Sequence, residues 1–248
     1  MTLALDHTQL SSAEIRLTTN LALAARILSA AGHDDFNQGQ VSARLPGRTQ
    51  FLIKSAQRGF SEATPDDVVA ADIDAAARPH PWAPPELPLH QAIYAVRPDV
   101  NAIVHSHAPS SLVFGALDAE LAAISHDGAV FVGRVSRFTT TSNTVLTRDI
   151  GDQVAQCLAD NPAVFLRNHG GVIVGKTLRH ATIYAQLLER ACQLQLAAMA
   201  TGVPFHVSSA IDVASKLDYI YSDTSLKSYW EYSVRQIRNA SAEARSWS

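Results

Sequence analysis

Three histidines stand at the ends of two apolar, strand-like segments. His105 and His107 close the stretch "AIVHSHAP" (residues 102–109), and His169 follows the apolar run 163–166 and precedes two glycines. Side chains two residues apart in a strand leave the same face of the sheet, so His105 and His107 point the same way. Three histidines with an open fourth position are the ligand set of a catalytic zinc site. The pattern predicts one bound divalent metal ion, with Zn²⁺ favoured and Mn²⁺ or Fe²⁺ as alternatives.

A carboxylate that could serve this metal lies in the proline-framed stretch "PPELP" (residues 84–88). Glu86 stands there at the start of a predicted helix that leads into the strand of His105. Acidic residues favour a helix N-terminus, so the position has a purely structural explanation. A glutamate beside a metal could instead be a fourth ligand, or a general acid or base once substrate displaces it. Both readings are open at this point.

Three more residues are candidates for contacts with substrate. Lys54 and Arg58 could attract an anion, since a carboxylate suits arginine in particular, or they could be solvated loop charges. His126, in "SHDG" (residues 125–128), could donate the proton that quenches a carbanion, or it could be an ordinary loop histidine. His90 is expected to pack inside a helix with a hydrogen bond. The other histidines are expected at the surface: His7, His33, His80, His180 and His206.

Helix and strand patterns alternate along the chain without a low-complexity linker, which predicts one layered α/β domain. The expected helices cover residues 12–31, 88–97, 147–158 and 178–200, with a short helix capped by Thr64. The expected strands cover residues 41–45, 50–53, 102–105, 129–132, 163–166 and 172–174. The segment after Ala210 is rich in Tyr, Ser and Trp and shows no long amphipathic period.

Composition narrows the classes of protein further. The 248 residues are 47% hydrophobic and 17% charged, which suits a globular chain with a sizeable core. The net charge of −3 gives no electrostatic case for binding nucleic acid or an anionic membrane. The N-terminus lacks the pattern of a signal peptide, and no apolar run reaches the roughly 18 residues of a membrane span. We therefore expect a cytoplasmic protein whose two cysteines, Cys157 and Cys192, are buried reduced thiols.

Two blocks of the sequence together resemble the class II aldolase and adducin family. They read "PPELPLHQAIYAVRPDVNAIVHSHAP" and "FLRNHGGVIVGKTLRHA", and the likeness runs from about residue 10 to residue 202. The resemblance implies that His105, His107 and His169 bind a divalent metal and that Glu86 is the acid or base. It also implies a three-layer α/β/α fold with a mixed, largely antiparallel central sheet, in one domain over residues 1–248. Family members are commonly homotetramers with active sites at subunit boundaries.

The departures from the family's sugar-phosphate pattern are informative. Sugar-phosphate members carry an Asn turn, a "PSG" loop and a Ser-Ser pair, where this chain has residues 37–42, 54–57 and Pro84-Pro85. Two prolines offer neither hydroxyl group. The pattern is therefore closer to the branch that includes decarboxylases of hydroxylated aromatic or heteroaromatic acids. The alternatives are an aldolase or epimerase of a sugar or sugar phosphate, a non-catalytic adducin-like interaction domain, and an iron-dependent oxygenase.

The C-terminal segment, about residues 210–248, carries four aromatic side chains with polar tips: Tyr219, Tyr221, Tyr229 and Trp230. Such side chains suit subunit interfaces, where an apolar body packs and a hydroxyl stays reachable. By resemblance, we expect this segment to lie over the active-site mouth of an adjacent subunit. The alternative is that it covers the core of its own domain.

Overall fold

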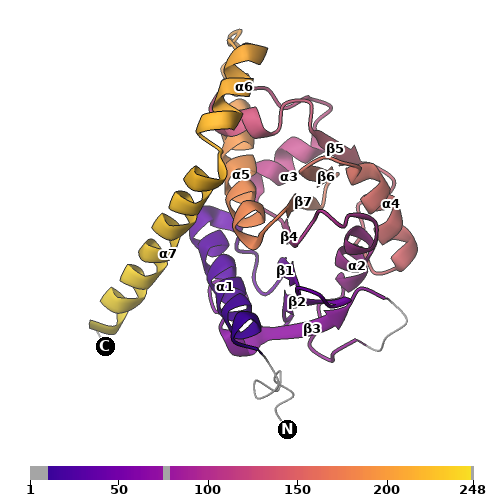
Figure 1. Cartoon of the computed structure of the whole chain (residues 1–248). Coiled ribbons are helices and arrows are strands. Elements are labelled where there is room, and N and C mark those ends of the chain that lie inside the picture. The colour runs from indigo at the N-terminus through magenta and orange to yellow at the C-terminus, as the bar shows by residue number, and fades with distance from the viewer. Residues whose placement is uncertain (1–10, 75–78, 247–248) are drawn as a thin grey trace.

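The computed structural model describes residues 11–74 and 79–246, so His7 lies outside the described residues. A seven-stranded sheet runs in the order β3-β2-β1-β4-β7-β6-β5 (Figure 1). Its strands are β1 (Gln40–Arg44), β2 (Gln50–Lys54), β3 (Val68–Asp72), β4 (Ala102–Ser106), β5 (Val135–Phe138), β6 (Ala163–Leu166) and β7 (Gly170–Gly175). Every neighbouring pair is antiparallel except β5 and β6, which are parallel. The predicted mixed, largely antiparallel sheet is confirmed.

Helices cover both faces of the sheet (Figure 1). They are α1 (Ser12–Leu28), α2 (Leu87–Val96), α3 (Pro109–Ala116), α4 (Arg148–Leu158), α5 (Leu178–Ala200), α6 (Ala210–Tyr219) and α7 (Asp223–Ser246). Helices α2 and α4 pack on one face, whereas α1, α3 and α5 pack on the other. This is the three-layer α/β/α arrangement that the sequence predicted. That residues 1–248 form a single domain stays a prediction.

Strand β4 contributes alternate side chains to the two hydrophobic cores, one on each face of the sheet. Val104 belongs to the core beneath α1 and α5, while its neighbour Ile103 belongs to the core beneath α2 and α4. Because side chains alternate between faces, His105 leaves the sheet on the side of Ile103, toward α2. Helix α2 starts at Leu87 with Pro88 in its first turn, so Glu86 is its N-cap residue. The start of α2 and the end of β4 therefore meet on one face.

Several local predictions are confirmed, and others are wrong. Ser11 and Glu14 form the capping box of α1, and Thr64 caps the short helix Pro65–Asp67. Residues 129–132 were expected as a strand, but Asp127–Val130 form a short 3₁₀ helix. An apolar run this short has no periodicity that could distinguish a strand from a short helix. Strands β3 and β5 and helices α3, α6 and α7 were not anticipated; the segment after Ala210, which shows no long amphipathic period, forms two helices.

Two histidines expected at the surface are buried. His33 is 2% exposed and its Nδ1 lies 2.8 Å from Ser106 Oγ. His180 is 3% exposed and contacts the Asp223 carboxylate at 2.9 Å. The surface prediction for these two histidines was based on the polar residues next to them in the sequence. It was wrong because the residues that bury and contact them come from elements distant in the chain. His90, by contrast, is the predicted hydrogen-bonded core histidine.

The middle of the C-terminal segment covers its own chain, whereas α6 at its start has no buried residue. Leu226 is fully buried, and Tyr221 and Trp230 pack with it against the core beneath α1 and α5. Farther along, α7 extends away from the sheet and its layers (Figure 1). The middle of this segment thus follows the alternative that the sequence left open. That the segment also covers a neighbour's site stays a prediction.

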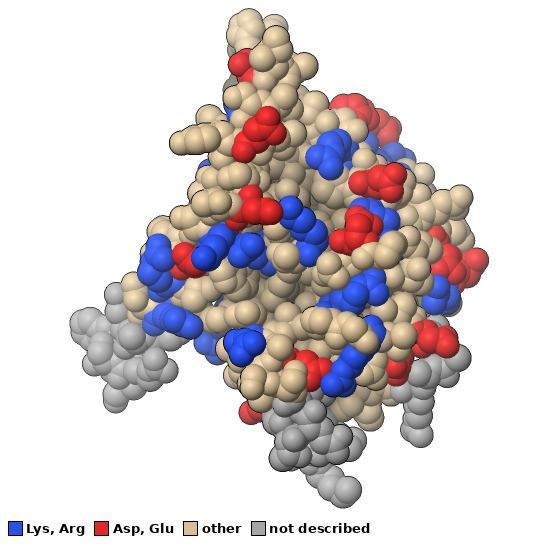
Figure 2. All heavy atoms as spheres, in the orientation of Figure 1, with Lys and Arg blue, Asp and Glu red and all other residues tan. Residues whose placement is uncertain are grey.

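The surface and the cysteines complete the description. Acidic and basic side chains are interspersed over the face in Figure 2, so opposite charges lie close together on much of it. Both cysteines are free thiols; Cys192 is buried as predicted, whereas Cys157 is partly exposed. None of the described helices combines the length and apolar character that a membrane span needs.

His33 predicts a loss of stability in acid. Burial lowers the pKa of His33 to about 4, although the charges of Glu189 and Asp34 raise it. The unfolded chain titrates near 6.5, so it binds more protons below that pH and the free energy of unfolding falls. The loss from this group develops between about pH 6.5 and pH 4 and totals roughly 3 kcal/mol.

We therefore expect the urea concentration at the unfolding midpoint, measured with a chelator present, to decrease when the pH is lowered from 7 to 4.5. The fall should be smaller in the His33→Gln protein, whose side chain does not titrate. An equal pH dependence in the two proteins would contradict this explanation.

Candidate metal centre

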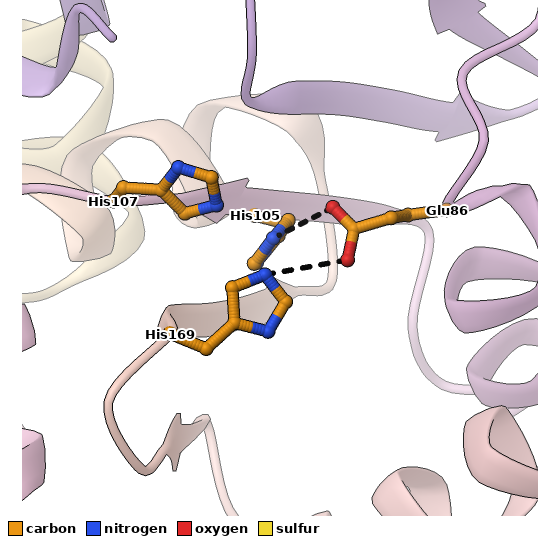
Figure 3. Close-up of side chains that lie close together, drawn as sticks. All are labelled: Glu86, His105, His107 and His169. Carbon is orange, nitrogen blue, oxygen red and sulfur yellow. Dashed lines mark ion pairs between the residues drawn. The ribbon is translucent and has the colours of Figure 1, made fainter. Parts of the chain in front are cut away.

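The four residues that the sequence singled out for metal chemistry converge at one point. Glu86, His105, His107 and His169 each offer one ligand atom, and these atoms all lie within 4.8 Å of one another. They come from the start of α2, the end of β4 and the turn between β6 and β7 (Figure 3). Residues far apart in the chain thus form one compact cluster.

Antiparallel pairing of β4 with β7 brings the histidines together. Ser106 is the Cα partner of Gly171, which places the turn of His169 beside His107. A side chain on Gly170 would put its Cβ 2.5 Å from the Ser106 carbonyl and 2.8 Å from the His107 ring. Asn168 completes the turn in the left-handed region, with φ at 58°. Gly170 is therefore required for this close approach.

Hydrogen bonds fix the rings of two histidines. His105 Nδ1 donates to the Gly171 carbonyl at 3.0 Å, and His107 Nδ1 donates to the Asp35 carboxylate at 2.7 Å. With Nδ1 protonated, each Nε2 presents a lone pair to the cluster. Both Nε2 atoms are buried. That of His105 faces the Glu86 carboxylate, whereas that of His107 has no hydrogen-bond partner within the described part of the chain. An unpartnered acceptor nitrogen such as that of His107 is what a cation would bind.

The two carboxylate oxygens of Glu86 face the rings of His105 and His169 (Figure 3). Oε2 lies 3.1 Å from His105 Nε2, and Oε1 lies 3.4 Å from His169 Nε2. The Val145 backbone N–H and the Gln40 side-chain amide also donate to the carboxylate, at 3.0 and 3.3 Å. Burial raises the pKa of Glu86, but the two histidines and the Val145 N–H outweigh it and hold that pKa below its usual range. The carboxylate is therefore ionised at neutral pH.

The histidines respond differently to this environment. Burial lowers the pKa of His105, but Glu86 outweighs burial and the net shift is upward. Burial is the largest cause that lowers the pKa of His169 to about 4, and neighbouring His105 lowers it further. His169 is thus neutral at pH 7, with a nitrogen free to bind a metal. A metal ion that binds His105 Nε2 would have to displace any proton shared between His105 and Glu86.

The donor set fits a divalent cation. Three imidazole nitrogens and one carboxylate oxygen are ligands that Zn²⁺, Mn²⁺ and Fe²⁺ accept. The three rings surround a common point, with centroids 5.0 to 5.2 Å apart. Ionised Glu86 supplies negative charge at that point, and the Gly170 backbone leaves room for the rings. The cluster is therefore a candidate metal centre.

Lys54 does not occupy the place expected of an anion-binding residue. The residue is only 1% exposed, and its ammonium donates to the carbonyls of Asn37, Ser55 and Arg58 at 3.4, 2.8 and 2.5 Å. Burial lowers the pKa of Lys54 to about 8. Three carbonyls occupy the three donors of an ammonium group. Lys54 therefore holds the loop together, and this arrangement does not support a contact with substrate.

Arg58 lies at the surface beside two carboxylates. Its guanidinium is 3.6 Å from Glu62 and 3.7 Å from Asp67, and its side chain is more than half exposed. Exposed pairs of this length contribute little to stability. Arg58 is not part of the metal cluster, so a role in binding substrate stays a prediction.

His126 lies on the other side of the sheet from the cluster. It lines a cavity of about 350 Å³ with Asp127, Tyr221 and Tyr229, next to α5 and α7. Glu86 begins α2 on the opposite face. The sheet therefore separates the two within one chain, and the structure does not support proton donation by His126 to its own cluster.

Sequence reasoning missed two residues that touch the cluster. Asp35 orients His107, and Gln40 donates to Glu86 from the strand position opposite His105. Both lie in the stretch "DDFNQGQVS" just before and within β1. Its clustered acidic and amide side chains were the available signal. Only the pairing of β1 with β4 shows that this stretch reaches the cluster.

Known proteins are similar to this chain in both sequence and fold. Residues 19–196 match the family described as Class II Aldolase and Adducin N-terminal domain. The chain is 32% identical to decarboxylase NovR of Streptomyces niveus over 195 residues, 77% of this chain and 72% of that protein. It is also 32% identical to the 4-hydroxy-3-prenylphenylpyruvate oxygenase/4-hydroxy-3-prenylbenzoate synthase of Streptomyces roseochromogenus subsp. oscitans, across 73% of this chain and 67% of that protein.

A solved structure supports the same assignment. The aldolase II superfamily protein from Pseudomonas syringae superposes with a TM-score of 0.83 at 26% identity, covering 95% of this chain and 97% of that one. The family match spans most of the chain and includes all four residues of the cluster. The chain therefore belongs to the class II aldolase and adducin family.

Proposed function

We propose that this protein is a divalent-metal-dependent carbon–carbon lyase, and specifically a decarboxylase of a small, non-phosphorylated hydroxylated aromatic or heteroaromatic acid. The observation that carries the proposal is the convergence of three imidazoles and an ionised carboxylate around one point. The relative named decarboxylase NovR supports the choice of decarboxylation. An interaction domain without catalysis has no need for such a cluster.

Each residue of the cluster has a role in this chemistry. A bound metal withdraws electrons from a ligating hydroxyl or carboxylate and so stabilises the negative charge left when a C–C bond breaks. His105, His107 and His169 hold the metal, and Asp35 keeps the ring of His107 in place. Glu86 holds or moves the proton, because its carboxylate faces the same point. Zn²⁺ is the metal we propose.

An iron-dependent oxygenase is the second candidate. The donor set accepts Fe²⁺, and one relative carries the word oxygenase in its name. Metal analysis of the purified protein, together with oxygen consumption, separates the two candidates. Decarboxylation without oxygen uptake supports the lyase.

We also propose that the protein works as a cytoplasmic homotetramer with active sites at subunit boundaries. Members of this family are commonly oligomeric and act on small molecules. In such an assembly His126 donates a proton to the cluster of a neighbouring subunit. Its cavity supports this proposal, because tyrosines of the C-terminal segment gather there, away from the chain's own cluster.

A substrate screen tests the proposed function directly. The Zn²⁺-loaded protein should release carbon dioxide from at least one member of a panel of hydroxybenzoates and hydroxy-dicarboxylates. Chelation of the metal should abolish the release and added metal should restore it. Aldehyde formation from sugar phosphates, with no carbon dioxide from any acid, would instead indicate an aldolase.

Loss of one imidazole should strip the metal. The His107→Ala protein is expected to lose bound metal after dialysis while keeping its far-ultraviolet circular dichroism, since a partly exposed ring is removed. Elemental analysis measures the metal, and His206→Ala, at an exposed position, is the matched control. Full occupancy in His107→Ala would refute the assignment of this ligand.

Loss of the carboxylate should slow turnover more than it affects folding. Glu86→Gln keeps the shape of the side chain and removes the proton carrier, so the rate of carbon dioxide release should fall roughly 10²- to 10⁴-fold. Asp152→Asn, on the exposed surface of α4, is the control. A near-normal rate in Glu86→Gln would mean that another group moves the proton.

Mixing two inactive variants tests the shared site. Glu86→Gln and His126→Ala proteins should each be nearly inactive, but unfolding and refolding them together should restore partial activity. Mixed oligomers contain boundaries where an intact Glu86 meets an intact His126. Activity that stays absent in verified mixed oligomers would show that the two residues do not serve one site.

A further inference from the structure

A small cavity opens beside Glu86 on the side of strand β1. Its volume is about 200 Å³, and Gln40 lines it together with Glu86. Pro84, Pro85 and Ala56 form an apolar part of the wall. The space adjoins the metal cluster, so part of a substrate bound at the metal would extend into it.

This cavity lacks the charge that a phosphate or second carboxylate needs. No lysine or arginine belongs to the described residues that line it. The nearby Lys54 ammonium is occupied by three backbone carbonyls, and Arg58 lies beside Glu62 and Asp67. The carboxylate of Glu86 is the charge that remains, and the polar residues Asn37, Gln38 and Thr144 of the lining are neutral, so no cation would offset the repulsion of a second anion. The cavity suits a neutral group.

Gln40 is one of several neutral polar residues in this lining, and its amide is the one that contacts Glu86. It is the Cα partner of His105 on the adjacent strand and is only 5% exposed. Its Nε2 donates to Glu86, and because an ionised carboxylate only accepts, the amide nitrogen must face that way. The Oε1 atom is therefore directed elsewhere, and it is a buried acceptor without a partner among the described residues.

We propose that Gln40 is a specificity-determining residue whose carbonyl oxygen accepts a hydrogen bond from a hydroxyl group of the substrate in this cavity. This inference rests on the proposed function for its class of substrate, a hydroxylated aromatic acid. A buried acceptor left unpaired is costly, so a ligand that brings a donor binds more tightly than one without it. Sites built around such a bond reject analogues that lack the hydroxyl.

Equilibrium binding tests the proposal without requiring turnover. The probes are benzoate, 3-hydroxybenzoate, 4-hydroxybenzoate and 4-carboxybenzoate, titrated calorimetrically into the Zn²⁺-loaded protein. One hydroxybenzoate should bind about 10-fold to 100-fold more tightly than benzoate. The 4-carboxybenzoate, which adds a second anion, should bind no better than benzoate. In Gln40→Met the advantage of the hydroxyl should disappear.

Gln91→Met is the matched control. Gln91 is equally buried and its amide donates to the Asp72 carbonyl, but it is not among the residues that line the cavity. This variant should keep the preference for the hydroxyl. Gln40→Asn, which withdraws the amide by one methylene group, serves if Gln40→Met fails to fold, and it should also lose the preference.

The possible results separate this inference from the proposed function. A hydroxyl preference that depends on Gln40, without carbon dioxide release from any acid, would support the inference and refute the decarboxylase. Carbon dioxide release with the same preference in wild type and in both Gln40 variants would do the reverse. Equal binding of benzoate and the hydroxybenzoates, or binding of none, would overturn the inference.

Discussion

The pairing of β4 with β7 is the interaction on which the rest of the site depends. It joins the two strands whose ends carry the histidines, and its register places Ser106 opposite Gly171. The same pairing supplies the Gly171 carbonyl that orients His105. A shift by one residue would turn the side chains of β4 to the other face, away from Glu86. Sheet register and ligand geometry are therefore one constraint.

Charge balance is the second constraint on this site. Three imidazole rings in contact are unfavourable when protonated, and buried nitrogens without partners are unfavourable when neutral. Two carboxylates provide the balancing negative charge. Glu86 faces the cluster, and Asp35 lies behind His107 and accepts a hydrogen bond from its ring. Gln40 and the Val145 N–H then stabilise the charge of Glu86.

The sequence predicted the sheet class and the convergence of the cluster residues, because spacing within a strand and the paired family blocks are local signals. It did not predict Asp35 or Gln40 as neighbours of the cluster, since their contacts follow from strand pairing across 46 residues or more. Lys54 was interpreted from its charge, but its environment is set by three carbonyls that no local pattern shows. His33 and His180 are buried by elements distant in the chain.

The order of strands also determines when the site can form during synthesis. His105 and the carbonyl that orients it are 66 residues apart, so two ligands leave the ribosome long before the third and its turn. Closing a loop of this length costs entropy before the contacts form, which makes such pairing a late step in folding. A nascent chain that ends before β6 holds only an incomplete ligand set. The candidate metal centre is thus assembled only after most of the sheet has been made, and until then the growing chain would offer an ion an incomplete set of ligands.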